Sequence, residues 1–289
     1  MDDTEAASEG DVRIGDASVH WRREGSGPPI VFLHGFPLSG RTWDAMISHL
    51  RDRFTCHAPD LIGLGGSHSA SGEDHASPGQ ARAIHAVLST LGLGSYALVG
   101  NDTGGWIARE LALIDPRVSH LILTNTEIPL HRPPWIPTYQ LLAQLPGAGT
   151  MFRQLLRLPA FRRSPMGFGG CFQDLSHIDG EFHRRFVEPL IASSDRMDGA
   201  MQFLRQMRFS RLDEFRTLHR QLAMPTLFIW GADDPTFPAA RARDMVLQFP
   251  NVRGFHSIAD AKLFLYEEHP QQIARIVDGF LRETTVGEG

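Results

Sequence analysis

The sequence predicts an α/β protein whose parallel sheet carries helices on both faces and is interrupted once by a helical insertion. Three observations support this fold class. Short apolar runs alternate with stretches of helical spacing in the first half of the chain, the strand signal disappears after residue 126, and it returns near residue 225. Strands that alternate with helices are typical of parallel sheets, which are buried on both faces.

The predicted strands are short apolar runs that end in turn-forming residues. They lie, in chain order, at 29–33, 54–58, 96–99, 119–124 and 225–230. Helical spacing between them predicts helices at 42–50, 80–91 and 106–114, and an amphipathic helix follows at 270–283.

The ends and the middle of the chain differ from this α/β pattern. Residues 1–11 are polar and acidic, and we expect them to form a flexible tail. Residues 127–216 carry prolines, arginines and helical patterns without a clear strand. The simplest account is one core formed by 12–126 and 217–284, with 127–216 as a helical insertion between two strands of the same sheet.

Composition excludes several classes of protein. The chain has 289 residues and a net charge of −5, so it lacks the basic character of a nucleic-acid-binding protein. No apolar run is long enough to span a membrane, and the acidic N-terminus contains no apolar signal segment. The two cysteines, Cys56 and Cys171, fit a reducing compartment. We therefore expect a cytoplasmic protein that acts on a small molecule, and the oligomeric state stays open.

The strongest chemical signal is the motif GNDTGG at 100–105, which follows an apolar strand and precedes a helix. So sharp a turn forces its apex residue, Asp102, into a strained backbone conformation and requires small neighbours. The side chain of Asp102 then projects beside the N-terminus of the next helix, where a nucleophile is expected. The alternative is a glycine-rich turn in which Asp102 only caps that helix.

Two further motifs follow predicted strands. HGFP at 34–37 can direct the backbone N–H of Phe36 toward the turn, where the N–H of Thr103 would complete a two-donor anion hole. WGADDP at 230–235 offers a carboxylate suited to orienting a histidine. Asp234 is the better candidate for that acid and Asp233 the second choice, and the alternative for both is a turn-forming aspartate.

Taken in order, HGFP, DLIGLGGS, GNDTGG and WGADDP resemble the α/β-hydrolase fold family, in the branch of haloalkane dehalogenases and epoxide hydrolases. The resemblance covers about 12–283. It implies an eight-stranded, mostly parallel sheet with a helical cap over its carboxyl edge. It also implies that Asp102 attacks an sp³ carbon and forms an alkyl ester, which a histidine-activated water hydrolyses without a metal or an organic cofactor.

The chain departs from this family at the histidine. The family pattern A-G-H-F-x-x-E-E-x-P, aligned with this chain at 261–270, places Leu263 where the histidine belongs. A leucine side chain cannot transfer a proton. His256 and His269 are poorly placed to replace the histidine, and we expect Lys262, which would be a poor base near neutral pH, to be solvated.

Three interpretations of Leu263 stay open. The histidine has been replaced deliberately, so that the ester accumulates; or the protein is a natural homologue with non-hydrolytic chemistry; or it is a ligand-binding receptor on a hydrolase fold. The intact remainder of the site favours the first interpretation.

The residues near the predicted nucleophile match no subfamily fully. Haloalkane dehalogenases hold halide with a tryptophan and an asparagine, where this chain has Thr103 and Phe36. Fluoroacetate dehalogenases carry two arginines, where this chain has Thr103 and Trp106, and epoxide hydrolases use two cap tyrosines, of which only Tyr139 is present. The apolar insertion and the missing arginines favour a neutral, apolar alkyl halide as substrate, with an epoxide as the second choice.

Three aromatic residues are candidates for the substrate pocket. Trp106 lies one helical turn beyond Asp102, and Trp135 and Tyr139 are four residues apart, so they would share one face of a helix. Ordinary packing is the alternative for all three.

Overall fold

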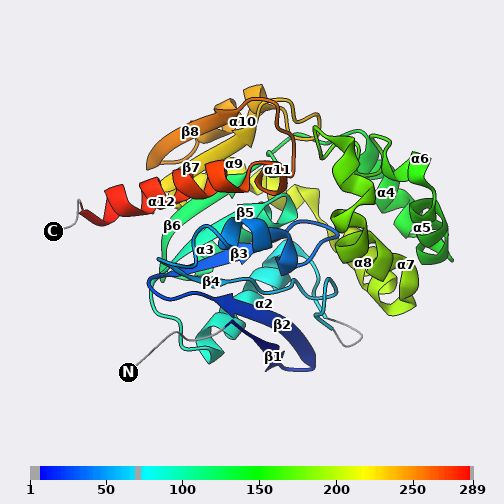
Figure 1. Cartoon of the computed structure of the whole chain (residues 1–289), viewed down its shortest axis with the longest axis horizontal. Helices are drawn as coiled ribbons and strands as arrows, with labels where there is room; N and C mark the ends of the chain where they lie inside the picture. Colours follow the sequence, from blue (N-terminus) through cyan, green and yellow to red (C-terminus); the bar gives the residue numbers. More distant parts are fainter. Residues whose placement is uncertain (1–6, 69–72, 287–289) are drawn as a thin grey trace.

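The structure, a computed structural model, describes residues 7–68 and 73–286. Within these residues eight strands form one sheet in the order β1-β2-β4-β3-β5-β6-β7-β8 (Figure 1). The pairings of β1 with β2 and of β2 with β4 are antiparallel, and all the others are parallel, which confirms the expected sheet. The strands are β1 (Ser8–Ile14), β2 (Ala17–Glu24), β3 (Pro29–Leu33), β4 (Thr55–His57), β5 (Tyr96–Asn101), β6 (Val118–Thr124), β7 (Thr226–Gly231) and β8 (Val252–Ile258).

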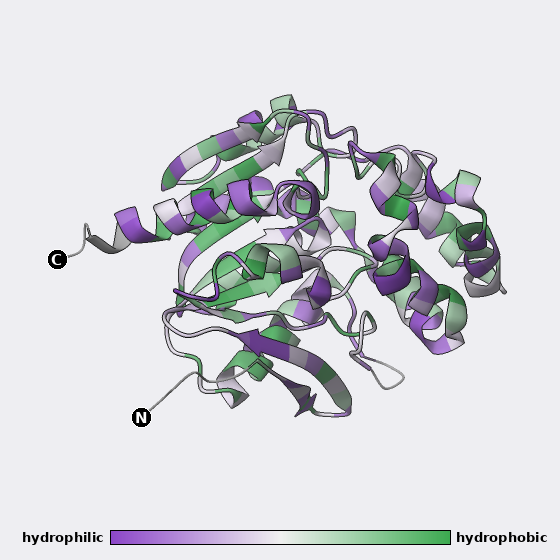
Figure 2. Cartoon of the chain, viewed as in Figure 1, coloured by the Kyte–Doolittle hydropathy of each residue, from purple (hydrophilic) through white to green (hydrophobic). Residues whose placement is uncertain are grey.

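The central strands form the core of the molecule. Every residue of β5 and β7 is buried, and β3 is buried apart from its first residue. The central strands carry much of the hydrophobic colouring in Figure 2, as expected where helices cover both faces of a parallel sheet. β3, β5, β6 and β7 are parallel neighbours, so the loops that follow them meet at one edge of the sheet.

Helices α2 and α3 pack against each other, and α1 packs against α12, which crosses in front of the sheet in Figure 1. The helices of the core are η1 (Gly40–Trp43), α1 (Asp44–Ile47), α2 (Ser77–Thr90), α3 (Thr103–Ile114), α10 (Ala239–Val246), α11 (Leu265–Glu268) and α12 (Pro270–Val286). None of the helices in the described ranges 7–68 and 73–286 is both long and apolar enough to cross a membrane.

Two expectations about the core were wrong. Of the tail expected over 1–11, residues 8–11 belong to β1 and pair with β2, whereas residues 1–6 lie outside the described residues. Backbone pairing forms this strand although its side chains are mostly exposed, so hydropathy gave no signal for it. The helix expected over 42–50 is also shorter, because a 3₁₀ turn precedes α1 and α1 ends at Ile47.

Every residue between β6 and β7 is described, and none of them lies in a strand. Residues 135–206 of this helical insertion form a lobe beside the sheet, in green in Figure 1, whereas residues 209–218 lie against the core. The helical structure of the insertion continues to Gln221, past the expected end at 216. The helices of the insertion are α4 (Trp135–Ala143), α5 (Ala148–Arg157), α6 (Pro159–Arg162), η2 (Leu175–Asp179), η3 (His183–Val187), α7 (Glu188–Ala192), α8 (Ser194–Gln206), α9 (Phe209–Leu218) and η4 (His219–Gln221).

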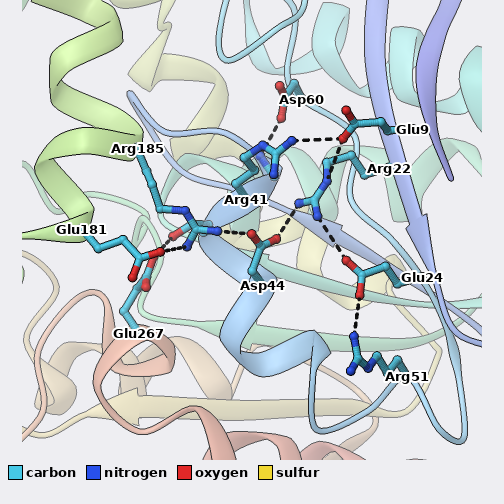
Figure 3. Close-up of polar contacts among 12 residues, drawn as sticks. Glu9, Arg22, Glu24, Arg41, Asp44, Arg51, Asp60, Glu181, Arg185 and Glu267 are labelled. Carbon is cyan, nitrogen blue, oxygen red and sulfur yellow. Dashed lines mark hydrogen bonds and ion pairs between the residues drawn. The ribbon is translucent and has the colours of Figure 1, made fainter. Parts of the chain in front are cut away.

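Charged side chains tie the helical insertion to the core. Arg185 in η3 pairs with Asp44 at the start of α1, and Asp44 also pairs with Arg22 from β2 (Figure 3). Arg22 and Arg51 both contact Glu24, which extends the network along the sheet edge. The insertion is thereby fixed to the core at a point outside the cavity described below.

Candidate active site

Asp102 forms the turn between β5 and α3. β5 ends at Asn101 and α3 begins at Thr103, so a single residue makes the turn, with φ 50° and ψ −136°. A positive φ is strained for a residue with a side chain. Hydrogen bonds fix it on both sides: Asp102 N donates to Asn125 O at 2.8 Å, and Asp102 O accepts the N–H of Gly105 at 2.8 Å.

Close backbone packing explains why glycine surrounds this turn. A Cβ atom at Gly104 would lie 2.2 Å from the carbonyl oxygen of Leu33, and a Cβ atom at Gly35 would lie 2.5 Å from the Cβ atom of Asp102. Both distances are far shorter than any van der Waals contact. The loop after β3 and the start of α3 therefore approach Asp102 only because these two positions carry no side chain.

The carboxyl group of Asp102 meets both N–H groups that the sequence predicted for an anion hole. Phe36 N donates to Asp102 Oδ2 at 2.9 Å, and the N–H of Thr103 also hydrogen-bonds the carboxyl group. In an ester of Asp102, these donors would face the oxygen that becomes negative when water attacks.

Burial dominates the electrostatics of Asp102, whose surface is 9% exposed. Burial raises the pKa of Asp102 well above its usual range, and the nearby carboxyl group of Glu127 raises it further. The hydrogen bonds from Thr103 and Phe36 oppose this rise because they stabilise the carboxylate form.

Asp234 lies in the turn after β7 and is buried, whereas Asp233 is exposed. Its Oδ2 accepts a hydrogen bond from Asn125 Nδ2 at 2.6 Å, and its Oδ1 accepts one from Thr236 N at 2.7 Å. Burial raises the pKa of Asp234 to about 7. Of the two candidate acids, Asp234 is the one that the fold encloses.

An apolar cavity of about 150 Å³ lies between the carboxyl edge of the sheet and the helical insertion. Asp102 and Thr103 line it from the core, and Trp135 and Tyr139, both on α4, line it from the insertion. The hydroxyl group of Tyr139 donates to the carbonyl oxygen of Met166. No cluster of three or more metal-binding side chains occurs in the part of the chain that the structure describes.

Trp106 does not line this cavity, contrary to the expectation from its spacing. Its side chain is 2% exposed and packs against Leu212 and Phe215 of α9, and its ring lies 5.9 Å from that of Phe209. At one helical turn beyond Asp102, the side chain of Trp106 therefore points toward α9 and away from the site.

Leu263 is buried and lines the cavity together with Asp102. The residues that line the cavity include no histidine. His256 is exposed on β8, and the Nε2 atom of His269 lies 3.2 Å from the carbonyl oxygen of Asp260. The loop that carries Leu263 packs against the turn after β7, where Asp233 N donates to Ala261 O at 3.0 Å.

The expectation that Lys262 is solvated was wrong. Its Nζ atom donates to the carbonyl oxygen of Phe172 in the insertion at 3.0 Å, and the residue is half-buried. Phe264 N likewise donates to Cys171 O at 3.0 Å, so the loop around Leu263 is attached to the insertion by two hydrogen bonds.

Glu127 is a residue of the site that the sequence analysis missed. It follows β6 by three residues, is 3% exposed and lines the cavity. Burial raises the pKa of Glu127 to about 7. The sequence signal was an acidic residue directly after a buried strand, at the edge where the other site residues lie, but it was assigned to the start of the insertion.

Comparisons with known proteins agree with this architecture. The family described as alpha/beta hydrolase fold matches residues 28–270. Haloalkane dehalogenase 2 of Mycobacterium tuberculosis is 29% identical over 90% of both chains, and epoxide hydrolase 3 of Xenopus tropicalis is 25% identical over 95% of this chain and 78% of its own. The structure of a loop variant of a haloalkane dehalogenase from Bradyrhizobium elkanii superposes with a TM-score of 0.78 at 22% identity, over 98% of both chains.

Proposed function

Because the chain belongs to the alpha/beta hydrolase fold family, we propose that Asp102 attacks an sp³ carbon of a neutral, apolar alkyl halide and forms an alkyl ester. The observation that carries this proposal is the position of the Asp102 carboxyl group, which lines an apolar cavity and meets two backbone N–H donors. The helical insertion serves as the cap that excludes water from this reaction.

The leaving halide requires hydrogen-bond donors but no proton. The hydroxyl group of Thr103 is buried beside Asp102 and lines the cavity, and its oxygen has no hydrogen-bond partner among residues 7–68 and 73–286. It is therefore available to donate to the departing halide. The cavity is lined by no arginine or lysine, which argues against a carboxylate substrate.

Hydrolysis of the ester is expected to be slow. In the related mechanism a histidine activates the attacking water, and here Leu263 stands at that position. The donors for the developing oxyanion are in place, but the group that removes the proton from water is missing. The ester on Asp102 should therefore accumulate.

An epoxide is the second candidate substrate. The observation that favours it is Glu127, a buried carboxyl group in the same cavity. Ring opening by Asp102 would give a hydroxyalkyl ester without release of halide.

The test is incubation of the protein with 1-bromohexane or 1,2-epoxyhexane, followed by intact-protein mass spectrometry and assays of free bromide and diol. We expect a covalent adduct that maps to Asp102 and is absent from Asp102→Asn. Free bromide together with an alkyl adduct would identify the halide reaction, and a mass gain equal to the whole epoxide would identify the other. Binding of these compounds without any adduct would favour a ligand-binding receptor.

A further inference from the structure

We propose that Glu127 is a second catalytic residue of this cavity, the general acid that protonates the leaving oxygen when Asp102 opens an epoxide. The inference rests on the proposed function and names the group that would make the epoxide reaction possible. Opening an epoxide requires a proton for the leaving oxygen, whereas displacing a halide does not, and the inference assigns this proton transfer to Glu127.

The first support is position. Glu127 and Asp102 come from the ends of two neighbouring strands, β6 and β5, and both line the cavity. Thr126 connects the two residues: its Oγ1 atom lies 2.8 Å from the backbone oxygen of Asp102 and 3.0 Å from Glu127 Oε2. A substrate carbon held at Asp102 therefore lies in a cavity that Glu127 also enters.

The second support is the number of protons available at Thr126. A hydroxyl group has one proton, so Thr126 cannot donate to both oxygens. The backbone oxygen of Asp102 can only accept. If Thr126 donates its proton to the backbone oxygen of Asp102, its close contact with Glu127 Oε2 is favourable only if Glu127 carries a proton and donates it to Thr126 Oγ1.

The third support is the difference between the two carboxyl groups. Asp102 accepts two backbone N–H groups, which stabilise its charged form. Burial raises the pKa of Glu127 to about 7 and outweighs a backbone N–H, the charge of Arg109 and the Thr126 hydroxyl, which also favour the charged form of Glu127. Arg109 makes no ion pair with this carboxyl group among the described residues. The buried guanidinium group of Arg109 instead donates to the backbone oxygen of Glu127 at 2.8 Å and to Thr126 Oγ1 at 3.2 Å. The two N–H donors of the anion hole therefore assign the role of nucleophile to Asp102, and Glu127, the other carboxyl group of the cavity, is assigned the role of acid.

The other polar groups of the cavity are poorer acids. Tyr139 already donates its proton to the carbonyl oxygen of Met166, and burial raises its pKa to about 12. Burial also raises the pKa of the Cys171 thiol well above its usual range. Leu263 carries no proton to transfer. Glu127 thus remains as the group able to act near neutral pH.

The proton balance of the reaction is complete. The Asp102 carboxylate attacks one ring carbon, the bond between that carbon and the ring oxygen breaks, and the oxygen takes the proton of Glu127. The products are a hydroxyalkyl ester on Asp102 and a Glu127 carboxylate. Slow hydrolysis of the ester gives the diol and a protonated Asp102, whose proton returns to the Glu127 carboxylate, so one epoxide and one water give one diol.

The experiment compares two substrates of equal chain length, 1,2-epoxyhexane and 1-bromohexane, and measures the rate of ester formation on Asp102 by intact-protein mass. For Glu127→Gln, we expect the ratio of the epoxide rate to the bromoalkane rate to fall by about 10²–10⁴-fold, the usual contribution of a general acid. The matched control is Glu267→Gln. Glu267 is also buried, with a pKa raised to about 7 by that burial, but it does not line the cavity, so its variant should leave the ratio unchanged.

An unchanged ratio in Glu127→Gln, or equal slowing with both substrates, would overturn the inference. If Glu127→Gln fails to fold, a second measurement on the unmodified protein tests the same inference. The unmodified protein should form the epoxide ester more slowly in deuterated water than in ordinary water, and its rate of ester formation with the bromoalkane should change little. The absence of that difference would also overturn the inference. If the unmodified protein forms no ester with either substrate, the proposed function itself fails, whereas a bromoalkane ester without an epoxide ester contradicts the inference alone.

Discussion

Asn125 Nδ2 donates a hydrogen bond of 2.6 Å to Asp234 Oδ2, and this bond joins the loop after β6 to the turn after β7. The other end of the same amide is also used, because Asn125 Oδ1 accepts the N–H of Gly231 at 2.7 Å. Asp234 is thus held in place by neutral donors although no histidine lines the cavity beside it.

Asn125→Ala should destabilise the fold. It leaves Asp234 Oδ2 and the N–H of Gly231 without partners, and each buried unpaired group costs roughly 1–3 kcal/mol. We expect the free energy of unfolding, measured in urea, to fall by roughly 2–6 kcal/mol. The control is Asn251→Ala, which removes one hydrogen bond, from Nδ2 to Ala223 O, at an exposed site and should cost less than about 1 kcal/mol. Equal losses for the two variants would contradict the anchoring role of Asn125.

Gly35→Ala should slow ester formation by about 10²-fold. The new Cβ atom would lie 2.5 Å from Asp102 Cβ and 2.6 Å from Asp102 Oδ2, so the carboxyl group must leave the N–H of Phe36. A misplacement of about 1 Å can cost about 10²-fold in rate. The measurement is the rate of adduct formation by mass spectrometry. Gly94→Ala is the matched control because its Cβ atom would meet nothing within 4 Å; similar rates in both variants would show that the close approach is unimportant.

The fold could be predicted from the sequence wherever a buried strand appears as a local run of apolar residues. The strands expected at 29–33, 54–58, 96–99, 119–124 and 225–230 correspond to β3–β7, because strands buried on both faces are nearly continuous apolar runs. β1 lacks such a signal, since its side chains are mostly exposed and its stability depends on backbone pairing with β2.

The residues of the site could be predicted only where a recognisable motif directly follows a strand. The turn at Asp102 and the burial of Asp234 agree with GNDTGG and WGADDP, and their catalytic roles stay predictions. The spacing could not predict where the side chain of Trp106 points. It gives only the distance from Asp102 along the helix, and the packing of α9 against α3 determines which face of α3 is covered. Glu127 was missed because only the pairing of β5 with β6 brings it beside Asp102.

The buried carboxyl groups of the protein should contribute stability that is lost as the pH rises from 5 to 8, and buried histidines whose pKa values are lowered, such as His57 and His219, act in the opposite direction. Burial raises the pKa of Glu267 from 4.5 to about 7, so the folded state holds this proton more tightly than the unfolded state does. The resulting stabilisation is complete below about pH 4.5 and is lost as the pH passes through 7, and Glu127 and Asp234 act in the same direction.

Relative to the unmodified protein, Glu267→Gln should raise the free energy of unfolding at pH 8 compared with that at pH 5 by up to roughly 3 kcal/mol, because its amide cannot ionise and can still accept the hydrogen bond from Thr42. Urea unfolding at pH 5 and pH 8 measures the change. Glu283→Gln, at an exposed position of α12, is the control and should keep the pH dependence of the unmodified protein. A Glu267→Gln protein with the same pH dependence as its parent would show that the buried carboxyl is not responsible.

Leu263→His should convert a single-turnover protein into one that turns over repeatedly. The side chain at 263 lines the cavity with Asp102, and its loop packs against the turn that carries Asp234. We expect Asp234 to orient the new imidazole, whose other nitrogen would then take the proton from the attacking water.

Because triad members act as a unit, the gain in steady-state turnover should reach several orders of magnitude. Leu263→Met, which keeps an apolar side chain of similar volume, is the control and should retain a long-lived ester. The measurement follows the mass of the Asp102 adduct of 1-bromohexane over time, together with the release of hexanol. In Leu263→His the adduct should disappear as hexanol accumulates, whereas in the unmodified protein and in Leu263→Met it should persist. Rapid repeated turnover by the unmodified protein would contradict the role assigned to Leu263, and would direct the search for the base to His256, His269 or the carboxylate of Glu127.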